Sequence, residues 1–86
     1  MFIHLGGDIA IAANNVIAII DVKHAKNDST QEFLNQMHTL GKLYRIEEKA
    51  SKSYVITDDC VYISPISSTT LKKRAFSVDA LHSLMP

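Results

Sequence analysis

Eighty-six residues suffice for one domain, and a chain of this size buries only about 60–65 % of the surface that its unfolded form exposes. Hydrophobic residues make up 47 % of the chain, a generous share for so small a core, which favours apolar surface that meets another subunit over the alternative of a compact monomer. Nine Lys and Arg balance nine Asp and Glu, and this zero net charge argues against a protein that coats DNA through overall charge.

The single cysteine, Cys60, excludes an intrachain disulfide and is typical of a reducing compartment. Gly6, Gly7 and Asp8 interrupt the N-terminal segment, so it does not have the pattern of a secretory signal. The longest apolar run, residues 16–20, is too short to span a bilayer. We therefore expect a cytoplasmic protein without a membrane partner.

The first twenty residues predict three short strands, over residues 2–5, 8–12 and 16–20. A glycine pair ends the first strand, and an asparagine pair marks a turn before the third. The third strand is β-branched at nearly every position, so we expect it to be covered on both faces. Together these strands predict a meander.

A polar connection at residues 21–28 leads to the clearest helix start in the chain. Ser29 and Glu32 have the capping-box spacing, which makes Ser29 the predicted N-cap. Gly41 follows as the left-handed residue that ends many helices. The pattern predicts a helix over residues 30–40, with one apolar stripe facing a core: Phe33, Met37 and Leu40.

Residues 43–47 and 53–57 predict a hairpin around a polar loop at residues 48–52. A turn at the adjacent Asp58 and Asp59 then leads to a strand over residues 60–63. These three strands predict a second meander.

Pro65 should end the last strand, because proline cannot donate a ladder hydrogen bond. A hydroxyl of Ser67, Ser68 or Thr69 then caps a short helix. Residues 76–85 predict another helical turn or two capped by Ser77, or a tail that docks on a neighbour.

The predicted fold class is α+β, with two short antiparallel β-meanders forming small twisted sheets on one central helix, followed by a short C-terminal helix. We divide the chain into a domain of residues 1–75 and a C-terminal tail of residues 76–86.

No residue pattern is typical of an enzyme or a metal site. The four histidines lack a helical i,i+4 pair and a neighbouring cysteine pair. No Gly-x-Ser-x-Gly elbow or phosphate-binding glycine loop is present. We therefore expect no catalytic residues, no metal, no cofactor and no small-molecule substrate.

Two groups of cations form the candidate site. The first group lies on the predicted hairpin: Arg45, Lys49 and Lys52, with Lys42 at the strand entrance. Glu47 and Glu48 lie within this group and weaken its positive field. The second group ends the short helix, where cations suit the helix dipole: Lys72, Lys73 and Arg74. Such groups are either a solvated surface or a face that binds DNA phosphates independently of sequence. We expect no aromatic residue among them, and therefore no base stacking as in single-strand or RNA binders.

Four segments carry a resemblance to a known family: Phe2-Ile-His-Leu-Gly6, Ile17-Ala-Ile-Ile-Asp21, Gln31-Glu-Phe-Leu34 and, most specifically, Tyr62-Ile-Ser-Pro-Ile-Ser-Ser-Thr-Thr-Leu-Lys-Lys-Arg74. Over residues 1 to about 74 the chain resembles the RemB (YaaB) group of the bacterial RemA/RemB family of extracellular-matrix regulators. The RemA branch comprises small DNA-binding regulators that activate biofilm-matrix operons and form rings whose basic surfaces contact DNA.

The resemblance implies a ring-forming homo-oligomer that binds DNA and regulates transcription. RemA contacts DNA through an arginine in an early turn and an arginine-rich loop before the fifth strand. The matching residues here are Asn15 in the turn and Lys49, Ala50 and Lys52 in the loop. Lysine keeps the positive charge but lacks the planar fork of arginine. The alternative is an oligomeric scaffold or protein-interaction module without direct DNA binding.

Overall fold

Residues 1–77 are described by the computed structural model, so residues 78–85 of the last predicted helix lie outside the described part of the chain. The strands are β1 (Phe2–Gly6), β2 (Ile9–Ala12), β3 (Val16–Asp21), β4 (Leu43–Arg45), β5 (Ser53–Thr57) and β6 (Val61–Ser64). The helices are α1 (Asp28–Thr39) and α2 (Ser68–Lys72), with 3-10 turns η1 (Ala13–Asn15) and η2 (Val22–His24) and a π-helical turn η3 (Lys73–Ser77).

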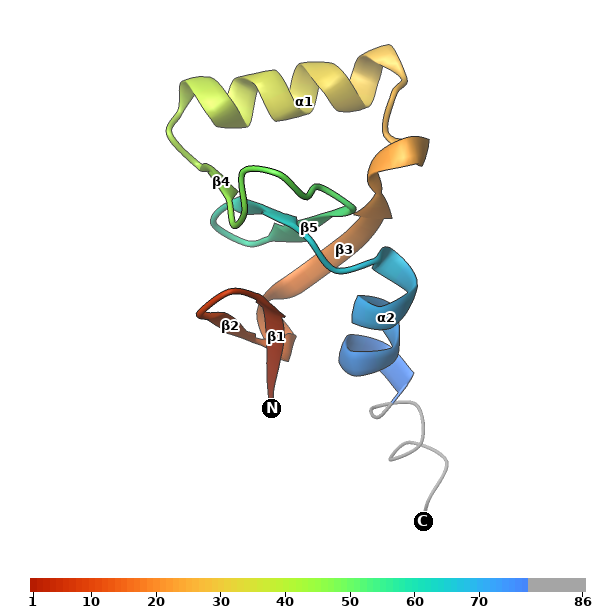
Figure 1. Ribbon diagram of the computed structural model, residues 1–86. Coiled ribbons are helices and arrows are strands. Elements are labelled where there is room, and N and C mark those ends of the chain that lie inside the picture. Colours follow the sequence, from red (N-terminus) through yellow and green to blue (C-terminus); the bar gives the residue numbers. More distant parts are fainter. Residues whose placement is uncertain (78–86) are drawn as a thin grey trace.

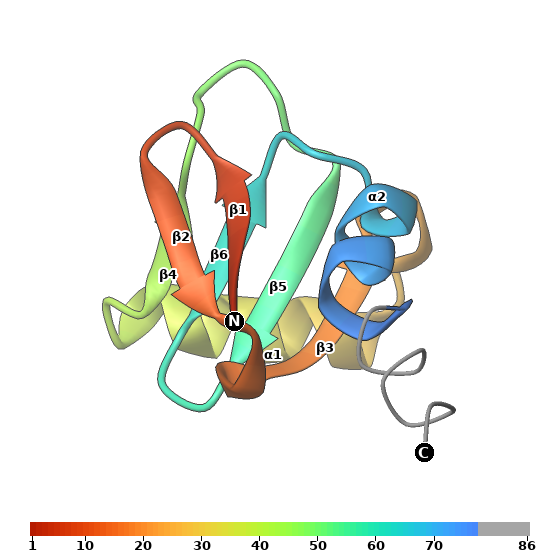
Figure 2. The same ribbon diagram turned by 90° about the horizontal axis from the view of Figure 1, so that it is seen from below.

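The described residues form three layers, with a four-stranded sheet in the middle (Figure 1). Helix α1 covers one face of this sheet, while the β1–β2 hairpin and α2 share the other face (Figure 2). The strand order is β3-β5-β6-β4, in which β4 runs parallel to β6 and the other neighbours are antiparallel. The predicted α+β class is confirmed.

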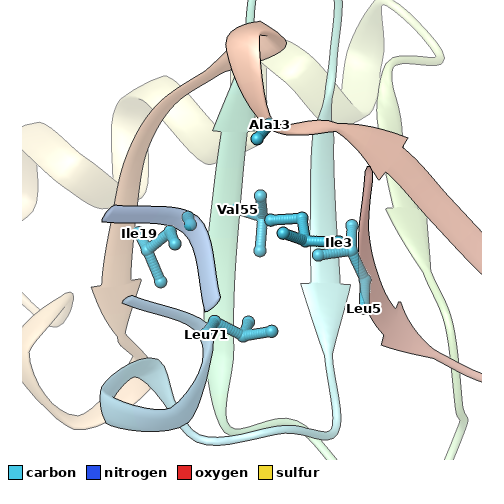
Figure 3. Close-up of a cluster of buried hydrophobic side chains, with 7 residues drawn as sticks. Ile3, Leu5, Ala13, Ile19, Val55 and Leu71 are labelled. Atoms are coloured by element: carbon cyan, nitrogen blue, oxygen red, sulfur yellow. The ribbon is translucent and has the colours of Figure 1, made fainter. Parts of the chain in front are cut away.

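The main core lies between the sheet and the layer made by the hairpin and α2 (Figure 3). Ile19 and Val55 pair across β3 and β5, and they cluster with Ile3 and Leu5 from β1 and Leu71 from α2. Complete burial of an aliphatic side chain of this size stabilises the fold by about 1.5–3 kcal/mol. The core therefore ties the small hairpin firmly to the sheet.

The predicted first meander is wrong in its third strand. Strands β1 and β2 pair as expected, but β3 leaves them after the turn η1 and pairs with β5. The β3–β5 register shifts between Val16 and Ala18, and Ile17 between them is 62 % exposed. The expectation of a strand covered on both faces is therefore wrong at Ile17, where the pairing of β3 with β5 is irregular.

The predicted second meander is wrong in its first strand. Strand β4 does not form a hairpin with β5, because β6 lies between them. Burial explains the order: Val61 and Ile63 in β6 are buried and require neighbours on both sides, whereas Tyr44 and Arg45 in β4 are exposed and suit an edge. The β5–β6 hairpin with its turn at Asp58 and Asp59 is confirmed.

Helix α1 forms as predicted, but it begins earlier. Asn27, not Ser29, is the N-cap, and its side chain accepts a hydrogen bond from the Thr30 N–H at 2.9 Å. The helix ends before Leu40, so this residue lies beyond the buried stripe and is 65 % exposed, contrary to the prediction. Gly41 has the expected left-handed φ of 71°.

The predicted end of the strand before Pro65 and the predicted start of the short helix after it are confirmed. Strand β6 ends at Ser64, directly before Pro65, and Ser67 caps α2 by accepting from the Thr70 N–H at 3.2 Å. Gly6 packs against Pro65 with a φ of 112°, and a β-carbon there would lie 2.7 Å from Pro65 Cγ. Only glycine permits this approach of the hairpin to the end of β6.

Ser64 joins three parts of the fold through hydrogen bonds. Its buried hydroxyl donates to the Leu5 carbonyl in β1 and accepts from the Ile66 N–H, 3.1 Å away, in the segment before α2. Its carbonyl accepts from the Lys52 N–H at 2.8 Å. The hairpin, the segment leading into α2 and the loop before β5 are thus fixed at one end of the sheet.

Replacing Ser64 with alanine should lower the free energy of unfolding by about 2–4 kcal/mol, because the Leu5 carbonyl and the Ile66 N–H lose their partner. Chemical denaturation followed by circular dichroism measures this change. Thr69→Ala removes an exposed hydroxyl from the same segment and should change stability little. Equal stabilities of the two variants would contradict the role given to Ser64.

Asn27→Ala should destabilise the fold by about 1 kcal/mol, the usual cost of losing an N-cap, whereas Ser29→Ala should cost less than about 0.5 kcal/mol. Thermal unfolding of both variants compares the two positions directly. A larger loss for Ser29→Ala would favour the capping box expected from the sequence.

Candidate nucleic-acid interface

The first group of predicted cations lies on the connection between β4 and β5, residues 46–52, here called the 46–52 loop, and on its flanks. The loop is anchored at its end: the Lys52 N–H donates to the Ser64 carbonyl at 2.8 Å, and the Lys52 carbonyl accepts from the Val22 N–H at 3.1 Å. These two bonds fix the Lys52 backbone between the ends of β6 and β3. The exposed side chain of Lys52 therefore projects from a fixed position.

Arg45 and Lys49 complete this first group. Arg45 is the last residue of β4, and its Nη1 donates to Ser51 Oγ near the end of the loop. Lys49 lies between them in sequence, in an exposed part of the loop. The structure thus places Lys49 and Lys52 on the 46–52 loop and Arg45 at the end of β4 directly before it, with its guanidinium bonded to the loop.

The second group is separate from the first. Lys72 ends α2, and Lys73 and Arg74 begin η3; all three are exposed. Arg74 Nη1 donates to the His4 carbonyl of β1 at 3.1 Å, and the side chain lines a groove of about 570 Å³ beside β1. Arg74 therefore attaches η3 to the hairpin, while Lys72 and Lys73 present their charge to solvent.

The fold places two further lysines near Lys52 that the sequence pattern does not single out. A cleft of about 410 Å³ is lined by residues from η2 and its flanks, from the 46–52 loop and from the N-cap of α2: Asp21, Val22, Lys23, Lys26, Ser51, Lys52 and Ser67. We call it the lysine cleft. The local sequence of residues 21–28 indicates only a polar connection. Its lysines lie beside Lys52 because β3 pairs with β5, and this pairing cannot be recognised from neighbouring residues.

Asn15, the early-turn residue to which the sequence resemblance points, lies far from the 46–52 loop in the same chain. The β3–β5 register pairs Val16 with Thr57 at one end and Asp21 with Ser53 at the other. Asn15 precedes the first pair and Lys52 precedes Ser53, so the two are separated by the length of β3, about 17–20 Å for six residues.

A second hollow lies beside β4, and it corrects the expectation of no aromatic residue among the cations. It measures about 780 Å³ and is lined by Ile9, Lys42, Tyr44, Arg45, Ile46, Asp59, Cys60 and Tyr62; we call it the tyrosine groove. The ring centroids of Tyr44 and Tyr62 lie 5.7 Å apart.

The hydroxyl of Tyr62 has a raised pKa. Hydrogen bonding with the Cys60 side chain raises it above its ordinary value, and partial burial adds to the effect. The Tyr62 hydroxyl is therefore neutral at physiological pH.

Residues 1–77 contain neither a metal-binding cluster nor a membrane-spanning helix. No group of three or more His, Cys, Asp or Glu side chains that could hold a metal ion occurs there. No helix in this range has both the length and the apolar character needed to cross a membrane.

The fold and the candidate site thus define a small α+β protein with exposed cations around one end of a mixed sheet. The model of the RemA-like family, described as extracellular matrix regulatory protein A-like, matches residues 2–75, and the chain belongs to this family. Extracellular matrix regulatory protein B of Bacillus subtilis (strain 168) is 38 % identical over 84 residues, which cover 93 % of this chain and 100 % of that protein. The predicted membership of the RemB group is confirmed. The division into residues 1–75 and 76–86 stays a prediction.

Proposed function

We propose that this chain is a ring-forming, DNA-binding regulator of extracellular-matrix and biofilm genes, which contacts DNA phosphates through repeated lysines and arginines. The observation that carries the proposal is the anchored 46–52 loop, which presents Arg45, Lys49 and Lys52 from one end of the sheet. Membership of a family of matrix regulatory proteins supports the regulatory role. The exposed Lys72 and Lys73 supply further cations.

Repetition is required because one copy carries few cations and no net charge. Affinity for DNA backbone depends on the number of phosphates that are neutralised together. Copies held in one assembly act at a high effective concentration, so their weak contacts reinforce one another. A ring that repeats the 46–52 loop therefore suits a neutral chain.

Exposed apolar and strand-edge surface supports self-association. Phe2 is 73 % exposed and Leu40 is 65 % exposed, values that leave large apolar side chains available for a neighbour. The Lys42 carbonyl and the Ile46 N–H bond to β6, so the alternate backbone groups of β4 face away from the sheet. Such an open edge is a ready surface for a second chain.

The placement of Asn15 favours a head-to-tail arrangement. Asn15 and the 46–52 loop lie at opposite ends of β3, so one chain cannot present both positions in one patch. When one copy follows another head to tail, the η1 turn of one approaches the 46–52 loop of the next. Repeated head-to-tail contacts close into a ring when the rotation between copies permits it.

The double substitution Lys49→Gln and Lys52→Gln should weaken binding to a fluorescent DNA duplex by at least about tenfold at low salt, because every copy then neutralises fewer phosphates. Fluorescence anisotropy over a series of salt concentrations measures both the affinity and its salt dependence. The slope of log affinity against log salt should fall by about 0.9 for each phosphate that the variant no longer neutralises.

A variant with the same change of net charge serves as the control. Asn35→Asp with Gln36→Glu adds two negative charges on the exposed surface of α1, which covers one face of the sheet, whereas the 46–52 loop lies at one end of it (Figure 1). This control should bind DNA nearly as well as the unmodified chain. Equal weakening in both variants would contradict a contact through the 46–52 loop. Absence of binding by the unmodified chain at low salt would refute the DNA-binding role.

Light scattering should give a mass in solution that is a multiple of the 9.5 kDa chain. Phe2→Asp should lower that mass, since burial of this side chain in a contact is worth about 1.5–3 kcal/mol. Asn35→Asp, on the exposed surface of α1, should not lower it. A mass of one chain at high protein concentration would refute the ring.

The tyrosine groove favours a second candidate, an oligomeric scaffold or protein-interaction module without direct DNA binding. Tyr44 is 50 % exposed in this groove, and tyrosine is enriched at protein interfaces. The DNA-binding and light-scattering experiments above distinguish the two functions. Assembly without DNA binding at low salt would identify the scaffold.

A further inference from the structure

The lysine cleft collects three cations from two separate segments of the chain. Lys23 and Lys26 belong to η2 and the residues after it, whereas Lys52 ends the 46–52 loop. Asp21 is the single carboxylate among the residues that line the cleft. The lining therefore carries two positive charges more than it carries negative charges.

The backbone on both sides of the cleft is held in place. The Asp21 carboxylate accepts from the Lys23 N–H at 2.8 Å, and the Val22 N–H donates to the Lys52 carbonyl at 3.1 Å. Ala25 after η2 is fully buried, and its carbonyl accepts from Gln31 Nε2 of α1 at 2.6 Å. The three lysine side chains therefore start from fixed points around one hollow.

Like charges repel when a fold brings them together, even in water. A bound anion removes this repulsion and adds attraction to each ammonium group. Ser51 also lines the cleft, and its Oγ accepts from Arg45 Nη1, so its own O–H can donate to an oxyanion. With water occupying about 30 Å³ per molecule, a cleft of about 410 Å³ accommodates a tetrahedral oxyanion with several waters.

We propose that the lysine cleft binds a phosphate group and that, in the assembled protein, this group is a phosphodiester of DNA. Lys23 and Lys26 would then extend the DNA-binding face beyond the 46–52 loop, with Lys52 shared by both parts. Lysine suits this site because it offers phosphate a compact point charge on a flexible stem. The inference rests on the proposed function for the source of the phosphate, but not for the site itself.

The first arm of the test uses inorganic phosphate alone. At constant ionic strength, the Tm of the unmodified protein should rise by at least about 2 °C more in phosphate than in chloride, because a ligand of the folded state stabilises it. Lys23→Gln with Lys26→Gln should lose this difference, while the control Asn35→Asp with Gln36→Glu should keep it. Any general stabilisation by phosphate salts acts equally on all variants and cancels in the comparison.

The second arm uses the DNA duplex. Lys23→Gln with Lys26→Gln should lower the slope of log affinity against log salt by about 0.9 for each phosphate left without its lysine, and the control should leave the slope unchanged. Disappearance of the phosphate effect together with a lower slope supports the proposal. An unchanged phosphate effect and an unchanged slope overturn it.

The two arms also separate this inference from the proposed function. A phosphate effect that depends on Lys23 and Lys26, in a protein that binds no DNA at low salt, supports the cleft as a phosphate site and refutes DNA as its source. DNA binding that depends on Lys49 and Lys52 but not on Lys23 and Lys26 overturns this inference and leaves the proposed function in place.

Discussion

The fold depends on a pair of buried serines at one end of the sheet. Ser53 and Ser64 face each other across β5 and β6, and both are fully buried. The Ser53 hydroxyl donates to the Ile66 carbonyl at 2.8 Å, while the Ser64 hydroxyl bonds both the Leu5 carbonyl and the Ile66 N–H. A buried polar group without a partner costs about 1–3 kcal/mol, so these bonds lock the surrounding segments in one arrangement. The β1–β2 hairpin, the 46–52 loop and the segment before α2 are therefore held at the same end of the sheet.

This constraint produces the candidate site as a consequence of the fold. The Ser64 carbonyl accepts from the Lys52 N–H, and the Lys52 carbonyl accepts from the N–H of Val22, the first residue of η2. A chain of backbone hydrogen bonds thus runs from β6 through the 46–52 loop to η2. Lysines on either side of this chain share the lysine cleft although about thirty residues separate them in sequence. Lysine is among the side chains that contact DNA phosphates, so this arrangement is consistent with the proposed phosphate site.

Local sequence patterns predict the structure correctly where it depends on neighbouring residues. The end of β6 at Pro65, the Ser67 cap and the left-handed Gly41 all follow from local chemistry. The same patterns fail where the outcome depends on distant partners, as in the pairing of β3 with β5 and of β4 with β6. The sequence groups Lys49 and Lys52 because they lie close together in one loop, whereas Lys23 and Lys26 come beside Lys52 only through the pairing of β3 with β5.

The start of α1 is difficult to predict from the sequence for a different reason. Asn27 and Ser29 both offer a side chain that can accept from a helix-start N–H, and both stand close to the first helical turn. The capping-box spacing favours Ser29, yet the helix begins two residues before that pattern indicates. Two suitable caps so close together leave the exact start of the helix to the geometry of the preceding turn η2.

The two arginines are held by hydrogen bonds within the fold, whereas the exposed lysines of the two groups remain flexible. The chain has two arginines, and each uses its planar guanidinium in a directed bond: Arg45 to Ser51 Oγ at the 46–52 loop, and Arg74 to the His4 carbonyl of β1. The exposed lysines of the lysine cleft and the 46–52 loop carry their charge on flexible stems. A fixed fork suits a contact within the fold, while a flexible point charge adapts to phosphates whose positions vary along a duplex. In a chain with no net charge, the proposed surface would therefore combine arginines held within the fold with lysines that remain flexible.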